Sequence, residues 1–117
     1  GRIDYDKLPN YYQSADIFVI PTLEDNWSLV VPEAMASGLP ILSSVYNGCY
    51  PEYITEKNGW VFDPLDSSDF ENKLETSFNC DNLKEMGENS KKIISNCTPL
   101  HAAKVVINAI EIAVKTK

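Results

Sequence analysis

The stretch of sequence that decides the fold runs from residue 16 to residue 45 and reads DIFVIPTLEDNWSLVVPEAMASGLPILSSV. It opens with an apolar run, 16–21, which is rich in β-branched and aromatic residues and closes on a proline; this is typical of a strand buried on both faces. A helix is predicted over 29–37 and ends at Gly38, where the missing Cβ permits a left-handed C-cap. The run 40–45 predicts a second buried strand.

Further elements are predicted on both sides of this stretch. A short helix is expected over Leu8–Ala15, and a third strand over Gly59–Pro64. Beyond that strand the chain reads as helical throughout. Ser68 and Glu71 are expected to form a capping box for a helix that runs to about Asn79.

Two more helices complete the prediction. Asp81 is expected to cap the first, and Thr98 stands as an N-cap before Pro99, at the first position of the second. Apolar residues then recur at spacings of three and four, which indicates a stripe on one face of that last helix. The stripe consists of Leu100, Ala103, Ile107, Ile110 and Val114.

The order of these elements predicts an α/β fold with a parallel sheet and right-handed crossovers. Three strands are few for such a sheet. We therefore expect the C-terminal half of a Rossmann-like domain, about three strands plus C-terminal helices, with its N-terminal portion missing.

Charge, apolar stretches and cysteine content limit the partners and the cellular location that we expect for the chain. The 117 residues carry 10 Lys and Arg against 17 Asp and Glu, a net charge of −7, and this disfavours nucleic acids and acidic membrane surfaces as partners. No apolar stretch reaches the roughly 20 residues needed to span a bilayer, and no signal peptide is recognisable, so we expect a cytoplasmic chain. The three cysteines have no metal-ligand spacing and are expected to be reduced thiols.

Ligands of parallel sheets bind beyond the carboxyl ends of the strands. Of the loops at those ends, the one after the first strand has the most groups that could bind a ligand. Its backbone N–H groups around Asn26–Leu29 lead into a helix start, which attracts anions. Asp25 and Glu33 are expected to lie roughly 10 Å apart on either side of that start. In the next loop, Gly48 would let backbone approach a ligand closely. This layout fits a nucleoside diphosphate-sugar. Carboxylates are natural acceptors of hydrogen bonds from the adjacent hydroxyl groups of such a ligand.

Two long runs, Leu8–Thr22 and Asn26–Pro40, and the shorter run Asn58–Phe62 resemble retaining glycosyltransferases of the group 1 (family 4) type. The resemblance covers nearly the whole chain and weakens in the terminal helices. It implies a two-domain GT-B fold, of which residues 1–117 would be part of the C-terminal, nucleotide-sugar-binding domain. The acceptor-binding N-terminal domain and the first half of this domain would be missing.

The resemblance also implies roles for individual residues. Glu33 matches the second member of the family's Glu-x(seven)-Glu motif and would bind the ribose of the donor. The first member falls on Asp25, with Glu24 beside it, and either of these two would face the sugar as the catalytic carboxylate. Ser28 stands where the family usually has Gly, and its backbone N–H would still contact the donor. Trp27 would pack over the loop as a lid or stack on the ligand.

The reaction implied is transfer of a hexose, with retention, from a nucleotide-sugar to a saccharide or glycolipid acceptor. Neither a metal nor a cofactor is expected. The fragment alone is expected to be inactive and, through exposed apolar stripes, to self-associate. We expect any membrane contact to be peripheral and to be made by the missing N-terminal domain.

Two alternatives stay open at this point. The chain could be a non-catalytic nucleotide- or protein-binding module, such as a truncated or decayed copy of the enzyme; the departures at Asp25 and Ser28 favour this reading. A Mg²⁺-dependent phosphotransfer site at Glu24 and Asp25 is the weaker alternative, because no third ligand is recognisable. The base and the sugar of the donor are not specified by these residues.

Overall fold

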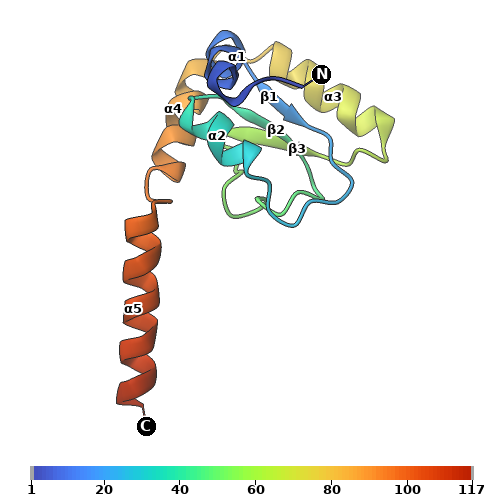
Figure 1. The fold of residues 1–117 in the computed structure, drawn as a ribbon. Coiled ribbons are helices and arrows are strands. Elements are labelled where there is room, and N and C mark those ends of the chain that lie inside the picture. Colours follow the sequence, from blue (N-terminus) through green and yellow to red (C-terminus); the bar gives the residue numbers. More distant parts are fainter. Residues whose placement is uncertain (1, 117) are drawn as a thin grey trace.

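The computed structural model describes residues 2–116 and contains a three-stranded sheet with helices on both sides (Figure 1). Strands β1 (Phe18–Ile20), β2 (Ile41–Ser44) and β3 (Gly59–Phe62) are parallel and lie side by side in that order. Phe18 pairs with Ile41 across the first ladder, and Ile41 with Gly59 across the second. The predicted α/β class with three parallel strands is confirmed.

The helices follow the predicted order. They are the 3-10 turn η1 (Tyr5–Lys7), α1 (Leu8–Ser14), α2 (Val30–Ala36), α3 (Ser67–Phe78), α4 (Leu83–Ile94) and α5 (Pro99–Lys115). The predicted end of α2 is confirmed at Gly38, which has a φ of 84° and donates its N–H to the Met35 carbonyl at 3.0 Å. Only glycine adopts this backbone conformation readily.

The central strand, β2, is buried on both faces, and different helices cover the two. Ile41 packs on one face in a cluster with Val31 and Met35 of α2. On the other face Phe62 of β3 packs against Phe70 of α3, with ring centroids 4.5 Å apart. Helices α2 and α3 therefore enclose the sheet between them.

Strand β1 differs from its prediction, because only one of its faces is covered. Phe18 and Ile20 pack against the α2 cluster, but Val19, which points to the opposite face, is 38% exposed. Helix α3 packs over β2 and β3. The expectation that this strand is buried on both faces was therefore wrong for its α3-facing side.

Two predicted helix caps were also wrong. Helix α3 is capped by Asp66, whose Oδ1 accepts hydrogen bonds from the N–H groups of Ser68 at 2.9 Å and Asp69 at 3.2 Å, so the helix begins before the predicted capping box. At α4 the N-cap position belongs to Asn82, with no side-chain cap, and not to Asp81. The cap of α5 is confirmed, since Thr98 Oγ1 accepts from the His101 N–H at 3.2 Å.

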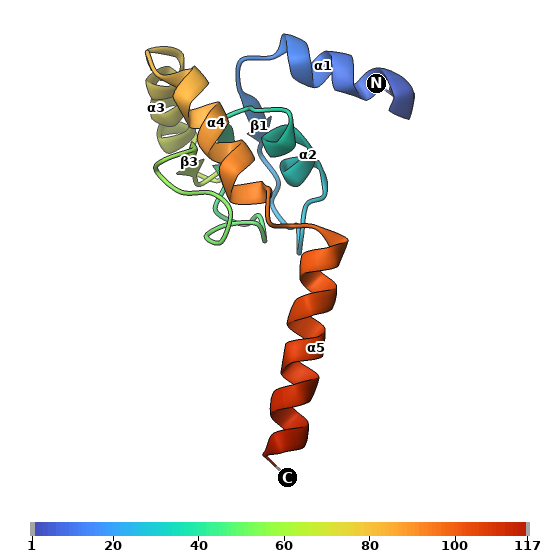
Figure 2. The same ribbon diagram turned by 90° about the vertical axis from the view of Figure 1, so that its left-hand side faces the viewer.

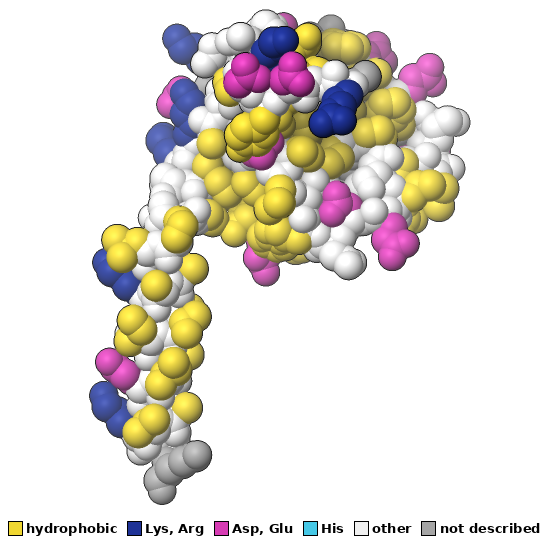
Figure 3. All heavy atoms as spheres, viewed as in Figure 1, with side chains coloured by type: hydrophobic (Ala, Val, Ile, Leu, Met, Phe, Trp, Pro, Cys, Tyr) yellow, Lys and Arg dark blue, Asp and Glu magenta, His cyan; other side chains and the backbone are white. Residues whose placement is uncertain are grey.

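Helix α4 packs against α2, whereas α5 stands clear of the sheet (Figure 2). None of its residues is buried, and its apolar side chains face solvent (Figure 3). In residues 2–116 no single helix is long and apolar enough to cross a membrane, although the pair α4 and α5, bent by 44°, passes that test together on length and composition. Self-association through the exposed α5 stripe stays a prediction.

Candidate functional site

The predicted site residues other than Glu33, which lies on α2, are found in two loops at one edge of the sheet. The first loop joins β1 to α2 and the second follows β2, so both leave the carboxyl ends of neighbouring parallel strands (Figure 1). Asp25 forms an isolated parallel β-bridge with Asn47, which continues the pairing of β1 with β2 beyond the strands themselves. The backbones of the two loops are therefore held together, and the loops form one continuous surface, which we call the braced surface.

Gly48 explains how closely the loops approach each other. Its N–H donates to the Asp25 carbonyl at 2.7 Å, and a Cβ at this position would lie 1.8 Å from the Asn26 carbonyl oxygen. Any side chain here would force the loops apart. The close approach that the sequence predicts at Gly48 is thus made to the protein's own backbone, and its contact with a ligand stays a prediction.

Asp25 and Glu24 differ in their surroundings. Asp25 is half-buried, and its Oδ1 accepts a hydrogen bond from the Trp27 N–H at 3.2 Å. The Glu24 side chain is exposed, and its carbonyl accepts from Thr22 Oγ1 at 3.0 Å. Asp25 is therefore the carboxylate that is fixed to the loop, while the Glu24 carboxylate is free to turn in solvent.

The residues that lead into α2 leave several backbone donors available. Helix α2 begins at Val30 and has no side-chain cap, and within residues 2–116 no hydrogen bond is donated by the N–H groups of Asn26, Ser28 or Leu29. The Trp27 N–H is already used by Asp25. Three backbone N–H groups next to the start of α2 are therefore without an acceptor in the described residues, and the anion site expected here stays a prediction.

The side chains of this loop brace it against the second loop. The Trp27 ring packs edge-on against Tyr53, with centroids 5.1 Å apart, and its role as a lid or as a stacking surface for the ligand stays a prediction. Ser28 is buried, and its carbonyl accepts from Cys49 Sγ at 3.4 Å. Burial raises the pKa of the Cys49 thiol, so the thiol stays protonated at neutral pH.

Glu33 lies in the first turn of α2, after the loop that joins β1 to α2, and is half-buried. Its Oε2 accepts a hydrogen bond from the Tyr12 hydroxyl of α1 at 3.1 Å. A half-buried carboxylate needs such a partner, because burying an unpaired charge is costly. Sequence reasoning missed Tyr12, since it lies 21 residues away and nothing local to either helix indicates the contact.

Sequence reasoning also missed Asn47. This side chain is buried in the second loop, where its Oδ1 accepts from the Cys49 N–H at 2.9 Å. Its Nδ2 has no hydrogen-bond partner within the part of the chain that the structure describes. The only sequence signal was the Asn-Gly pair, which is typical of turns.

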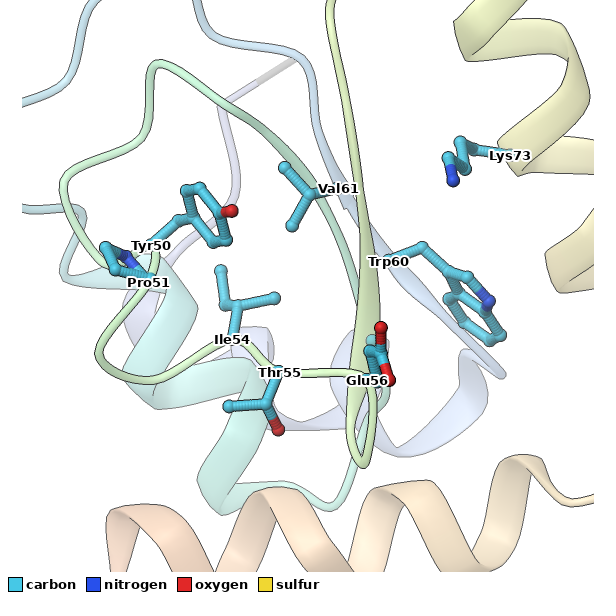
Figure 4. Close-up of a pocket in the computed structure, with 9 residues that line it drawn as sticks. Tyr50, Pro51, Ile54, Thr55, Glu56, Trp60, Val61 and Lys73 are labelled. Atoms are coloured by element: carbon cyan, nitrogen blue, oxygen red, sulfur yellow. The ribbon is translucent and has the colours of Figure 1, made fainter.

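Among residues 2–116 no group of three or more His, Cys, Asp or Glu side chains could hold a metal ion. A cavity of about 600 Å³ lies along β3 and contains none of the predicted site residues (Figure 4). It is lined by Tyr50, Pro51, Ile54, Thr55, Glu56, Gly59, Trp60, Val61 and Lys73.

Comparison with known proteins identifies relatives of the chain. It is 40% identical over 80 residues to sulfoquinovosyl transferase SQD2 of Arabidopsis thaliana, covering 65% of this chain and 16% of that protein. It is 30% identical over 89 residues to the UDP-Gal:alpha-D-GlcNAc-diphosphoundecaprenol alpha-1,3-galactosyltransferase of Escherichia coli, covering 76% of this chain and 23% of that enzyme. The chain thus spans less than a quarter of either relative.

Fold comparison and the family model agree with these relatives. The crystallised C-terminal domain of the group 1 glycosyl transferase LpcC from Francisella tularensis superposes with a TM-score of 0.70 at 26% identity, covering 82% of this chain and 50% of that domain. The fold is accordingly that of the C-terminal domain of GT-B proteins. The model of the family described as glycosyl transferases group 1 matches residues 1–93, and the chain belongs to that family.

Proposed function

We propose that the chain supplies the nucleotide-sugar-binding surface of a retaining glycosyltransferase, which transfers a hexose to a saccharide or glycolipid acceptor. One observation carries this proposal. Within residues 2–116, the N–H groups of Asn26, Ser28 and Leu29 in the loop between β1 and α2 donate no hydrogen bond, and the carboxylates of Asp25 and Glu33 lie before and after them. A nucleotide-sugar presents complementary groups in the same order: the hydroxyls of the hexose, the diphosphate anion and the hydroxyls of the ribose.

In this arrangement the donor diphosphate accepts hydrogen bonds from the three N–H groups. Glu33 accepts hydrogen bonds from the ribose hydroxyls, and Asp25 or Glu24 accepts them from the hexose. Asp25 is the better candidate for the sugar, because its hydrogen bond to the Trp27 N–H already holds it to the loop. A fixed carboxylate loses less conformational entropy on binding than a mobile one.

The chemical step follows from the same groups. As the bond between the hexose and the diphosphate breaks, a hydroxyl oxygen of the acceptor bonds to the hexose carbon, and the leaving diphosphate, on which negative charge grows, takes up the proton that this hydroxyl loses. N–H groups that donate hydrogen bonds to the leaving diphosphate oxygen stabilise the transition state more than the ground state, and this lowers the barrier. The chain supplies this charge stabilisation without a metal, so we expect a chelator to leave the activity unchanged.

The names of the relatives support a sugar nucleotide, since the Escherichia coli enzyme is named for its UDP-Gal donor. To test the proposal, the intact protein is incubated with UDP-, GDP- and ADP-sugars and a set of saccharide and glycolipid acceptors, and release of the nucleoside diphosphate is measured with and without EDTA. Asp25→Asn is expected to lower kcat at least tenfold, about the effect of removing one charged hydrogen bond formed in the transition state. Glu75→Gln, on the exposed surface of α3, is the control. Absence of nucleotide release with every donor would refute the proposal.

A further inference from the structure

Tyr12 stands out because it is the hydrogen-bond partner of a predicted donor-binding residue but has no assigned role. Its ring packs against Phe18 of β1, with centroids 6.0 Å apart and an interplanar angle of 58°. This contact anchors α1 to the edge strand and directs the hydroxyl at Glu33 Oε2, 3.1 Å away. Tyr12 and Glu33 also share the wall of a cavity of about 250 Å³ between α1 and α2.

The bond has a defined direction. Burial, the hydrogen bond to Glu33 and the negative charge of Glu33 together raise the pKa of Tyr12 to about 12. The hydroxyl therefore keeps its proton at neutral pH and donates it to the carboxylate. A carboxylate offers about four lone-pair positions, so one bond from Tyr12 leaves Oε1 free and Oε2 able to accept a second hydrogen.

We propose that Tyr12 is a positioning residue, which holds the Glu33 carboxylate in the orientation that accepts the two adjacent hydroxyls of the donor ribose. This rests on the proposed function. A glutamate side chain on a helix surface has several rotamers, and binding must pay for selecting one of them. The bond from Tyr12, itself held by Phe18, makes that selection before the donor arrives, which raises affinity by preorganisation.

The test compares Tyr12→Phe with the parent in the intact protein, because this change removes only the hydroxyl and keeps the ring on Phe18. The ligands are UDP, ADP and GDP, each paired with its 2′,3′-dideoxy analogue, and the pair that binds most tightly is used for the Kd measurements. Tyr12→Phe is expected to weaken the ribose nucleotide about fivefold, the effect of one hydrogen bond to a charged group, and to change the dideoxy nucleotide by less than about twofold. Tyr11→Phe is the matched control, since Tyr11 directly precedes Tyr12 on the same helix but is 57% exposed.

The dependence on the ribose hydroxyls separates positioning from a structural role. If Tyr12→Phe weakens both nucleotides equally, or neither, the positioning role is overturned. Glu33→Gln, measured with the same pair, distinguishes the two levels of the proposal. If Glu33→Gln weakens the ribose nucleotide while Tyr12→Phe does not, only the inference on Tyr12 fails; if Glu33→Gln has no effect, the proposed ribose site fails with it.

Discussion

Replacing Gly48 by Ala tests whether the two loops form one braced surface. The new Cβ would lie 1.8 Å from the Asn26 carbonyl oxygen, and this backbone atom cannot move aside as a flexible side chain could. Separating the loops would also break the 2.7 Å hydrogen bond from the Gly48 N–H to the Asp25 carbonyl. Overpacking costs roughly 1–3 kcal/mol and the lost bond about 1 kcal/mol, so we expect Gly48→Ala to lower the free energy of unfolding by about 2–4 kcal/mol.

Urea denaturation of the intact protein, followed by circular dichroism, measures this loss. The Kd for the donor nucleotide should rise in parallel, because Asp25 and the N–H group of Asn26 move with the loop. Tyr46→Ala, in the same loop, is the control: it removes a side chain that is 42% exposed and adds no atom between the loops. An unfolding free energy for Gly48→Ala within about 0.5 kcal/mol of the parent, the usual range for surface substitutions, would refute the reasoning.

Three further predictions concern pH and association. The folded-state pKa of Tyr12 is raised to about 12, so its contribution to stability is present below the ordinary tyrosine pKa of about 10 and is lost as the pH rises through 12. Over that pH interval Tyr12→Phe should therefore lose less stability than the parent, which urea midpoints measure. Tyr53→Phe is the comparison, because the pKa of Tyr53 is also raised to about 12. Hydrogen bonds from Ser68 and Asp69 lower the pKa of Asp66, so its contribution is present above the ordinary aspartate value and is lost as the pH falls through the lowered one; thermal melts of Asp66→Ala should show lower stability than the parent at neutral pH and a smaller loss in acid. Ile107→Asp, in the exposed α5 stripe, should reduce any concentration-dependent association in sedimentation velocity, and equal association of variant and parent would exclude that stripe as the contact.

The order of strands and helices could be predicted because each element carries its own local signal. The apolar runs specify the strands, and Gly38 and Thr98 mark helix ends by the chemistry of single residues. The start of α3 was placed wrongly because Asp66, Ser67 and Ser68 are all good N-caps, and only the backbone geometry selects among them. The exposure of Val19 depends on where α3 lies over the sheet, which no pattern within β1 reports.

The site could be predicted only as far as its position. Parallel topology places the loops of Asp25 and Gly48 at one edge, and this follows from the sequence. The contacts that shape the loops do not: the Gly48 approach to Asn26 and the Tyr12 bond to Glu33 each join residues more than twenty positions apart. Such contacts arise from the packing of elements, so the sequence could not indicate that Tyr12 is the hydrogen-bond partner of Glu33.

The most direct test of the proposed site is the donor affinity of Glu33→Ala in the intact protein, measured by isothermal titration calorimetry. If Glu33 accepts the ribose hydroxyls, removing its carboxylate should weaken donor binding by more than about 1.5 kcal/mol, or over tenfold, while the unfolding midpoint shows that the variant is folded. An unchanged Kd in a folded Glu33→Ala protein would contradict the claim that this edge of the sheet binds a nucleotide-sugar through Glu33.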